Sequence, residues 1–573
     1  MGVEFSLHAY TEWNRHGMLR FDTAACAVRI TAGRTPLPYR AHQPVSRRLV
    51  LLSGAAMAGG VGLAPEKACP QPAIRRGGSL AINIGTEPPA LIQVTQSAGA
   101  TYFIGGKINE SLLTYDNDFN PQPLLATEWA VTPDGLRYHF KLRQGVKWHD
   151  SQEFTAADVA YSILTLKQYH PRGRVTFASV DKVNAIGPYE VELELSKPAP
   201  YLLWAFASFE SPILPRHLYE GTSIGENPNN IAPIGTGPFK FVEWARGSHV
   251  RVVRNDGYWD AAKPYLDQII FRFIVDPAAA VAAIETGDVQ VSVATLPLAD
   301  ISRLKESRKL VVDTDPVPYS PTIARAEFNL ENPYLADIRV RHAIAYAINK
   351  DFIVRTIYLG YATRLDGPIS PELTRFYTPD LPKYEFNPAK AEKLLDEAGY
   401  KRGADGVRFK LFIDPTQPSG PPKQTAEYFA QALGKVGIKV EQRSQDFATF
   451  VKRIFTDRSF DIAIEGMSNF YDPTVGIQRL YWSKNFKPGV PFTNGSRYIS
   501  PEVDRLLEDA AVEVDPVKRR KLFDSFQKQV VEDLPTLDLV TPSVIVVYDK
   551  RVKNLKTGVE QLWSNGANIY LGS

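Results

Sequence analysis

The chain has 573 residues, of which 44% are hydrophobic and 23% are charged, the composition of an ordinary globular protein. A chain of this length exceeds the size at which one hydrophobic core stops growing, so two or three domains are expected. The formal net charge is +3, but residues 1–64 contain seven Arg and three acidic residues, leaving 59 basic and 60 acidic residues after them. This balance excludes the basic surface of a nucleic-acid-binding protein.

Residues 46–64 predict a secretory leader. Arg47 and Arg48 precede an apolar core at 49–64 that ends in small residues, which is the order of a signal peptide. The core is shorter than the about 20 residues of a membrane-spanning helix. The paired arginines resemble a twin-arginine signal, although Val50 stands where that pattern usually has Phe, so a Sec signal is the alternative. We therefore expect residues 1–64 to form the leader and the mature protein to be periplasmic.

The only two cysteines, Cys26 and Cys69, stand near the N-terminus. Neither a disulfide framework nor a cysteine-based metal site is therefore expected in the body of the chain. Cys69 follows Glu66, Lys67 and Ala68, which do not match a lipoprotein box, so no lipid anchor is expected.

After the leader, hydrophobic periodicity predicts strands mixed with helices along the whole chain. Runs that alternate like strands lie at 79–84, 137–143, 189–195, 250–254, 268–275 and 438–441. Helical spacing with capping residues predicts helices from Thr155 to Leu166, from Asp337 to Phe352, from Asn387 to Gly399, at 423–435, at 501–514 and at 516–533. Mixed strands and helices indicate α/β layers and not a repeat array.

Five ordered stretches carry a family resemblance. The first, Leu125 to Ser162, includes Gly145 to Asp150 and Phe154 to Val159, and it resembles the signature of the dipeptide-, oligopeptide- and nickel-binding proteins of ABC importers. The other four follow in the family's order, at 235–239, 255–259, 337–348 and 389–400. Ser151 departs from the family, which usually has Gly there, and the resemblance covers about residues 79–573.

The resemblance implies an α/β, two-lobed periplasmic-binding-protein-like fold of class II, the three-domain oligopeptide-binding type, with mixed sheets and flanking helices. It implies that one lobe comprises 79–122, 234–320 and 541–573, that 123–233 is a subdomain inserted in it, and that 321–540 is the other lobe. A peptide or other small polar solute would be enclosed between the lobes as they close about a two-segment hinge. The implied partners are the transmembrane subunits of an ABC permease, and we expect a monomer without a cofactor.

The cleft chemistry departs from that of the family's peptide binders. Those proteins commonly use a Trp and an Asp shortly before a Pro, and the Asp, four residues before it, neutralises the ligand's α-ammonium. Here Asn469 occupies the Asp position before Pro473, so a buried ammonium would lack its counter-charge. Either Asp472 or Glu87 substitutes for that Asp, or the ligand has no free amino terminus. Asn469 also fits a turn, and we expect Asp472 to cap the helix that follows.

Aromatic side chains and one loop complete the predicted site. Phe470, Tyr471 and Trp482 are expected to provide apolar and stacking walls, with at least one of them in the core. The loop at 86–90, with Glu87 and Ala90, resembles the first-lobe loop that borders ligand in this family. Its backbone would pair with an extended peptide as an added strand does.

Other function classes find less support in the sequence. The body contains no metalloprotease motif, no Gly-x-Ser-x-Gly, no phosphate-binding Gly-rich loop and no Cys nucleophile, so we do not expect an enzyme. Its six His lack metal-motif spacing, His149 is expected to be a turn or core residue, and the Asp313/Asp315 pair is expected to be solvated. Within the binding class, opines, oligosaccharides and other small polar molecules are alternatives to peptides, as is a protein that presents its ligand to a sensor.

Overall fold

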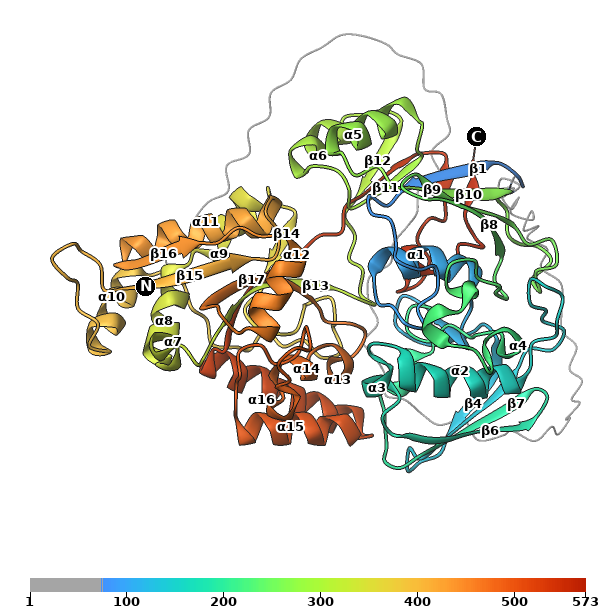
Figure 1. Cartoon of the computed structure of the whole chain (residues 1–573), viewed down its shortest axis with the longest axis horizontal. Helices are drawn as coiled ribbons and strands as arrows, with labels where there is room; N and C mark the ends of the chain where they lie inside the picture. The colour runs from blue at the N-terminus through green and yellow to red at the C-terminus, as the bar shows by residue number, and fades with distance from the viewer. Residues whose placement is uncertain (1–73, 75, 573) are drawn as a thin grey trace, which may run out of the picture. The chain divides into compact units, whose positions relative to one another are not determined.

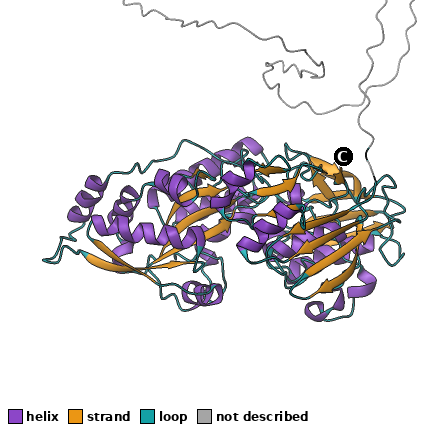
Figure 2. Cartoon of the chain, turned by 90° about the horizontal axis from the view of Figure 1, so that it is seen from above, coloured by secondary structure: helices purple, strands orange, loops and turns teal. Residues whose placement is uncertain are grey.

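Strands from distant parts of the sequence combine into three large sheets in the part of the chain that the computed structural model describes, residue 74 and residues 76–572 (Figure 1). The predicted leader, with Arg47 and Arg48, lies outside these residues. Figure 2 shows that helices and strands are mixed throughout the described chain, as an α/β class requires.

The seven-stranded sheet has the order β12-β19-β11-β1-β10-β9-β8. Its strands are β1 (Ser79–Asn83), β8 (Phe239–Ala245), β9 (His249–Arg254), β10 (Gln268–Arg272), β11 (Val291–Val293), β12 (Leu310–Asp313) and β19 (Val546–Asp549). β1 is parallel to β10 and β11, and the other pairs are antiparallel. The alternation of β1 buries Leu80 and Ile82 in a core that helix α1 (Gly99–Ile108) joins, with the Phe103 ring edge-on to Phe271 at 5.9 Å.

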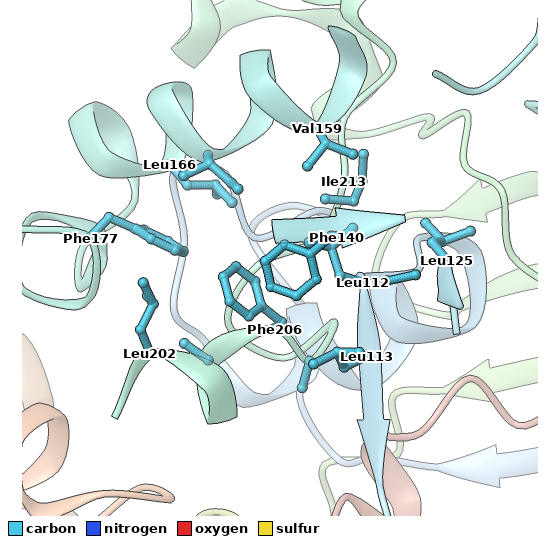
Figure 3. Close-up of a cluster of buried hydrophobic side chains, with 14 of the residues drawn as sticks. Leu112, Leu113, Leu125, Phe140, Val159, Leu166, Phe177, Leu202, Phe206 and Ile213 are labelled. Atoms are coloured by element: carbon cyan, nitrogen blue, oxygen red, sulfur yellow. The ribbon is translucent and has the colours of Figure 1, made fainter. Parts of the chain in front are cut away.

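The four-stranded sheet is antiparallel and has the order β4-β5-β7-β6. Its strands are β4 (Ala126–Val131), β5 (Arg137–Leu142), β6 (Val180–Gly187) and β7 (Glu190–Leu195). Helix α2 (Ala156–Tyr169) lies over it and starts at a capping box of Thr155 and Asp158 (Figure 1). Beneath α2, the rings of Phe140 and Phe206 meet at 5.0 Å in an enclosed apolar cluster (Figure 3).

The six-stranded sheet has the order β14-β18-β13-β17-β15-β16. Its strands are β13 (Thr322–Phe328), β14 (Ala362–Arg364), β15 (Phe409–Pro415), β16 (Ile438–Gln442), β17 (Ile462–Ser468) and β18 (Thr536–Pro542). The longer helices of this region are α8 (Ile338–Ala347), α10 (Pro388–Glu397), α11 (Gly420–Lys435), α15 (Pro501–Val512) and α16 (Pro516–Asp533). The helices α15 and α16 lie side by side (Figure 1).

Shorter elements connect these layers. The remaining strands are β2 (Leu113–Tyr115), β3 (Pro121–Pro123), β20 (Val552–Lys553) and β21 (Tyr570–Leu571). The remaining α-helices are α3 (Gly173–Thr176), α4 (Arg216–Tyr219), α5 (Pro277–Thr286), α6 (Leu298–Lys305), α7 (Pro333–Ala336), α9 (Lys350–Phe352), α12 (Phe447–Val451), α13 (Pro473–Gly476) and α14 (Gln478–Tyr481). No helix of the described residues is long and apolar enough to cross a membrane.

The chain passes twice between the seven-stranded and the six-stranded sheet. The first connection, 314–321, joins β12 to β13, and the second, 543–545, joins β18 to β19. The four-stranded sheet, by contrast, is formed within the segment between β3 and β8.

Most predicted elements are confirmed, because their signals are local. The strands predicted at 79–84 and 137–143 correspond to β1 and β5, and Asn387 caps α10 as expected, accepting a hydrogen bond from the backbone N–H of Lys390. The helix predicted from Asp337 to Phe352 is wrong in its extent. It ends at Ala347 because Ile348 is extended and Asn349 caps a new helix, accepting from the N–H of Phe352.

Three expectations about single residues have clear outcomes. His149 is a half-buried turn residue, with Nδ1 accepting from the N–H of Gly235 at 3.2 Å, and desolvation lowers its pKa to about 4. Ser151 has φ 75°, so it keeps the left-handed backbone that favours Gly. The expectation of a solvated Asp313 is wrong, because its side chain is 10% exposed and pairs with Lys556 at 2.7 Å.

Candidate ligand-binding site

Four aromatic rings join the loop after β17 to the region of the four-stranded sheet. The ring centroids of Phe470 and Phe209 are 6.1 Å apart, those of Tyr471 and Tyr319 are 5.0 Å apart, and those of Phe209 and Tyr319 are 5.4 Å apart. All four side chains are at most 5% exposed. Each such pair contributes about 0.5–1.5 kcal/mol beyond its buried area. We call these four residues the aromatic junction.

A buried ion pair borders the aromatic junction. Arg172 donates to one oxygen of Glu210 from Nε at 2.8 Å and from Nη2 at 2.6 Å, and the hydroxyl of Thr176 donates to the other oxygen at 2.6 Å. Burial opposes the ionisation of Glu210, but Arg172 outweighs it and holds the pKa of Glu210 below its ordinary value. The guanidinium of Arg172 also lies 4.5 Å from the centroid of the Phe470 ring. Both oxygens of Glu210 are therefore engaged by Arg172 and Thr176.

A second guanidinium approaches the same ring from the other sequence region. The guanidinium carbon of Arg479 lies 5.7 Å from the centroid of Phe470. Its Nε donates to the carbonyl of Gly476 at 3.2 Å and its Nη1 to the carbonyl of Phe492 at 2.6 Å. No carboxylate of the described residues lies within 4.0 Å of it. Burial, and then the charge of Arg172, lower the pKa of Arg479 to about 9.

Arg375 fastens the backbone of the aromatic junction. It donates to the carbonyl of Tyr471 at 3.0 Å, and its guanidinium lies 4.2 Å from the Trp204 ring and 4.4 Å from the Phe119 ring. Burial lowers the pKa of Arg375 to about 10. Cation–π contacts of this kind are strongest where water is excluded.

Two buried polar groups near this region have no hydrogen-bond partner among residues 76–572. They are the hydroxyl of Tyr471 and both ring nitrogens of His170. Burial lowers the pKa of His170 to about 3, so its ring is neutral. Burial raises the pKa of Tyr471 well above its ordinary value, and the charges of Glu210 and Arg172 act on this phenol. Unpaired buried polar groups are rare in proteins, and these two lie beside the Arg172–Glu210 pair.

Asn469 and Asp472 are both buried and already paired within the protein. Asn469 accepts from the N–H of Ser370 at 2.6 Å and donates to the carbonyl of Pro368 at 3.2 Å. Each oxygen of Asp472 accepts from Arg519 at 2.7 Å. Asp472 also caps α13 by accepting from the N–H of Thr474, which confirms the expected cap. Neither side chain has an unengaged oxygen of the kind an incoming ammonium requires.

The other sequence-predicted residues have partners outside the aromatic junction. Glu87 accepts from Trp244 Nε1 at 2.8 Å and from the N–H of Gly247 at 3.1 Å. Trp482 donates from Nε1 to Glu508 at 2.8 Å, and Ala90 is 6% exposed. The structure thus brings Phe470 and Tyr471 together with the first half of the chain, and it places Glu87 and Trp482 in contacts of their own.

Sequence reasoning missed four of the residues at this site: Arg172, Glu210, Arg375 and Arg479. One signal was present, because Glu210 stands within an apolar run at 202–214, where an acidic residue requires a partner. The arginines carry no comparable signal, since an Arg near the surface and an Arg facing an aromatic cluster look alike in sequence.

The loop between Asn469 and Gly476 is held in a restricted conformation. Phe470 has φ 50°, a left-handed value that is unfavourable for an aromatic residue. Gly476 is packed so closely that a Cβ atom there would lie 1.7 Å from the carbonyl oxygen of Asn469. The close approach of α13 to the loop therefore fixes where the Phe470 ring points.

Replacing Gly476 with Ala is expected to lower the free energy of unfolding by about 1–3 kcal/mol, because the added methyl group forces this loop away from α13. Denaturant unfolding measures the change. Gly434→Ala on α11 is the matched control, since nothing lies within 4 Å of its Cβ position, and it is expected to stabilise the protein by about 0.5–1 kcal/mol. Equal unfolding free energies for Gly476→Ala and the wild type would show that the loop is not fixed in this way.

Comparisons with known proteins agree over most of the chain. Residues 120–489 match the model of the bacterial extracellular solute-binding proteins, family 5. The oligopeptide-binding protein AppA of Bacillus subtilis is 28% identical over 488 residues, which cover 82% of this chain and 87% of AppA.

Two solved structures give the same fold. The crystal structure of Bacillus subtilis AppA in complex with a nonapeptide superposes with a TM-score of 0.75 at 26% identity, covering 87% of this chain and 100% of that one. The binding protein AgaA of A. tumefaciens R10, in complex with agropinic acid, has a TM-score of 0.71 at 26% identity and covers 87% and 99%. The expected α/β, two-lobed binding-protein fold is confirmed. The chain belongs to the bacterial extracellular solute-binding proteins, family 5.

Proposed function

We propose that this chain is the substrate-binding component of an ABC importer, which captures a peptide or peptide-like solute and delivers it to a membrane permease. The observation that carries this proposal is the aromatic junction, where Phe470 and Tyr471 meet Phe209, Tyr319 and Arg172 in a chain that aligns with AppA over 82% of its length. An aromatic cluster with a few convergent polar groups is the usual composition of a small-ligand site.

The lobes in this proposal follow sheet membership. The seven-stranded sheet and the residues 79–122, 234–320 and 541–573 form one lobe, into which 123–233 is inserted, and the six-stranded sheet lies in the other lobe at 321–540. The ligand binds where the lobes meet, with Phe470 and Tyr471 contributed by the second. The chain acts as a monomer without a lipid anchor, exported through the leader at 1–64, by the twin-arginine route in preference to Sec.

The ligand in this proposal does not place an α-ammonium at Asn469. Asn469 is neutral and engaged by Ser370 and Pro368, and both oxygens of Asp472 are engaged by Arg519. Glu87 is engaged by Trp244 and Gly247. An ammonium buried beside these groups would lack a counter-charge, which is costly. N-blocked peptides, and non-peptide solutes such as opines, therefore fit the site better than ordinary peptides.

Thermal and denaturant unfolding of the purified protein tests the proposal against free peptides, N-acetylated peptides, opines and oligosaccharides. A true ligand at 100 times its Kd is expected to add about 2.7 kcal/mol to the free energy of unfolding. Phe470→Ala is expected to remove the stabilisation, whereas Phe386→Ala, which replaces an exposed Phe elsewhere, is expected to leave it unchanged. If a ligand still stabilises Phe470→Ala, its site is not the aromatic junction. If none of the four classes stabilises the wild type, the proposed function is contradicted.

A further inference from the structure

The charges around the aromatic junction do not balance. Four guanidinium groups reach this region, and the two carboxylates that pair with them are each used by one arginine. Glu210 pairs with Arg172, and Asp472 pairs with Arg519. The remaining guanidinium groups, Arg375 and Arg479, have no carboxylate within 4.0 Å among residues 76–572.

The neighbouring acidic groups do not supply the missing charge. The charges of Glu465 and Arg325 also act on Arg479, but these two groups are paired with each other: Arg325 donates to Glu465 at 2.8 Å and lies 3.4 Å from Glu327. Arg375 and Arg479 are therefore part-buried cations that no carboxylate of the described residues pairs with.

Arg375 and Arg479 differ in the contacts that their guanidinium groups already make. Arg375 is held by two aromatic rings and by the backbone of Tyr471, so its role in the fold is accounted for. Arg479 uses Nε and Nη1 for backbone carbonyls, and its Nη2 has no acceptor in the described part of the chain. The side chain of Arg479 is only part-buried. It therefore combines an uncompensated charge with a free donor beside the Phe470 ring.

The surroundings of Arg479 favour an anion. The positive charge of Arg172 acts on it across the same aromatic ring, since both guanidinium groups lie within 6 Å of the centroid of Phe470. An anion bound beside this ring relieves that repulsion and completes the coordination of Arg479. The left-handed backbone of Phe470 is a strained feature of the type that is retained at ligand sites.

We propose that Arg479 is the anion-recognition residue of this binding protein, and that its physiological ligand is a carboxylic acid without an α-ammonium at Asn469. The ligand class is an N-blocked peptide acid or an opine-like acid whose carboxylate accepts from Nη2 of Arg479. This inference rests on the proposed function and names the chemistry of its ligand.

Isothermal titration with matched ligand pairs tests the inference. The probes are N-acetylated alanine peptides of two to five residues and opines, each as the free acid and as the carboxamide. Neutral oligosaccharides serve as ligands without a charge. The acid is expected to bind about 10- to 100-fold more tightly than its amide, the worth of one charge-assisted hydrogen bond. Equal binding of acid and amide, or binding of oligosaccharides alone, would overturn the inference and leave the proposed function standing. Failure of every probe would contradict the proposed function itself.

Variants of Arg479 show whether this residue causes the preference for the acid. Arg479→Gln is expected to remove the preference for the acid and leave amide binding within about 2-fold, whereas Arg479→Lys keeps the charge and part of the preference. The matched control is Arg505→Gln on α15, an exposed Arg that pairs with Glu502 and Asp509, and it is expected to bind both forms as the wild type does. Circular dichroism checks that each variant is folded. If Arg479→Gln still prefers the acid, the assignment to Arg479 is overturned. If the variant does not fold, the comparison of acid and amide binding to the wild type decides whether the ligand is an anion.

Discussion

Replacing Arg519 with Met is expected to lower the free energy of unfolding by about 3–5 kcal/mol, because it leaves Asp472 as an unpaired charge in the interior. Both oxygens of Asp472 accept from Arg519 at 2.7 Å, and the two side chains are 0% and 4% exposed. Arg519 also donates to the hydroxyl of Thr474 and to the carbonyl of Ala510, so its removal leaves two further acceptors without a donor. Urea unfolding at pH 7 measures the loss.

Two variants show whether the loss comes from breaking the Arg519–Asp472 pair or from changing helix α16 itself. Lys521→Met, on the exposed side of the same helix α16, is expected to change stability by no more than about 0.5 kcal/mol. The double variant Arg519→Met/Asp472→Asn is expected to be more stable than Arg519→Met alone, since the buried charge is gone. A double variant that loses the sum of the single effects would mean that the two side chains act independently.

Replacing Arg325 with Met is expected to cost about 3–5 kcal/mol at pH 9.5 and clearly less at pH 6.5. Arg325 lies on β13, fully buried, and donates to Glu465 from Nε at 3.0 Å and from Nη2 at 2.8 Å. Glu327 lies 3.4 Å from the same guanidinium. Without the cation, two carboxyl groups share a buried site, and only protonation can neutralise them.

The sign of the pH dependence follows from Glu465. Burial, and then the charge of Glu327, raise its pKa to about 8 in the folded protein, against 4.5 for the ordinary group. A raised pKa contributes stability that is fully present below pH 4.5 and is lost as the pH rises toward 8. Loss of Arg325 raises the pKa further, so both proteins lose this stability in parallel below about pH 7, and Arg325→Met falls further behind the wild type only as the pH approaches and passes 8.

Unfolding free energies of both proteins, measured at pH 5, 6.5, 8 and 9.5, give the difference between them directly. Glu465→Gln, which mimics the protonated group, is the matched control, and its stability is expected to fall less between pH 5 and pH 8 than that of the wild type. A deficit of Arg325→Met that is constant with pH would contradict the assignment of the buried charges.

Sequence reasoning succeeded where the determining signal is local. The start of α10 at Asn387 and Pro388, and of α16 at Asp515 and Pro516, follow from side-chain caps and the fixed φ of proline. The break after Ala347 was missed because it depends on tertiary contacts, among them the Tyr428 hydroxyl, which accepts from the N–H of Asn349.

The same distinction applies to the site. The position of the loop carrying Phe470 and Tyr471 follows from a short motif that ends at Pro473. The partners of these rings do not, because Phe209 and Arg172 are more than 250 residues away in sequence and meet them only in the fold. Whether a charge such as that of Asp472 is free for ligand also depends on a distant residue, Arg519.

Tyr319 belongs both to the aromatic junction and to a segment that links two sheets. Tyr319 lies in the segment 314–321, one of the two stretches through which the chain passes between the seven-stranded and six-stranded sheets. It packs on Tyr471, and its hydroxyl donates to the carbonyl of Trp204 at 2.8 Å. Tyr319 therefore contacts both the loop after β17 and the segment that carries Trp204. In the proposed function, a rotation of the lobes about the linking segments would strain these two contacts of Tyr319. The proposed hinge and the proposed ligand contact surface would then share this side chain, which would couple opening to release.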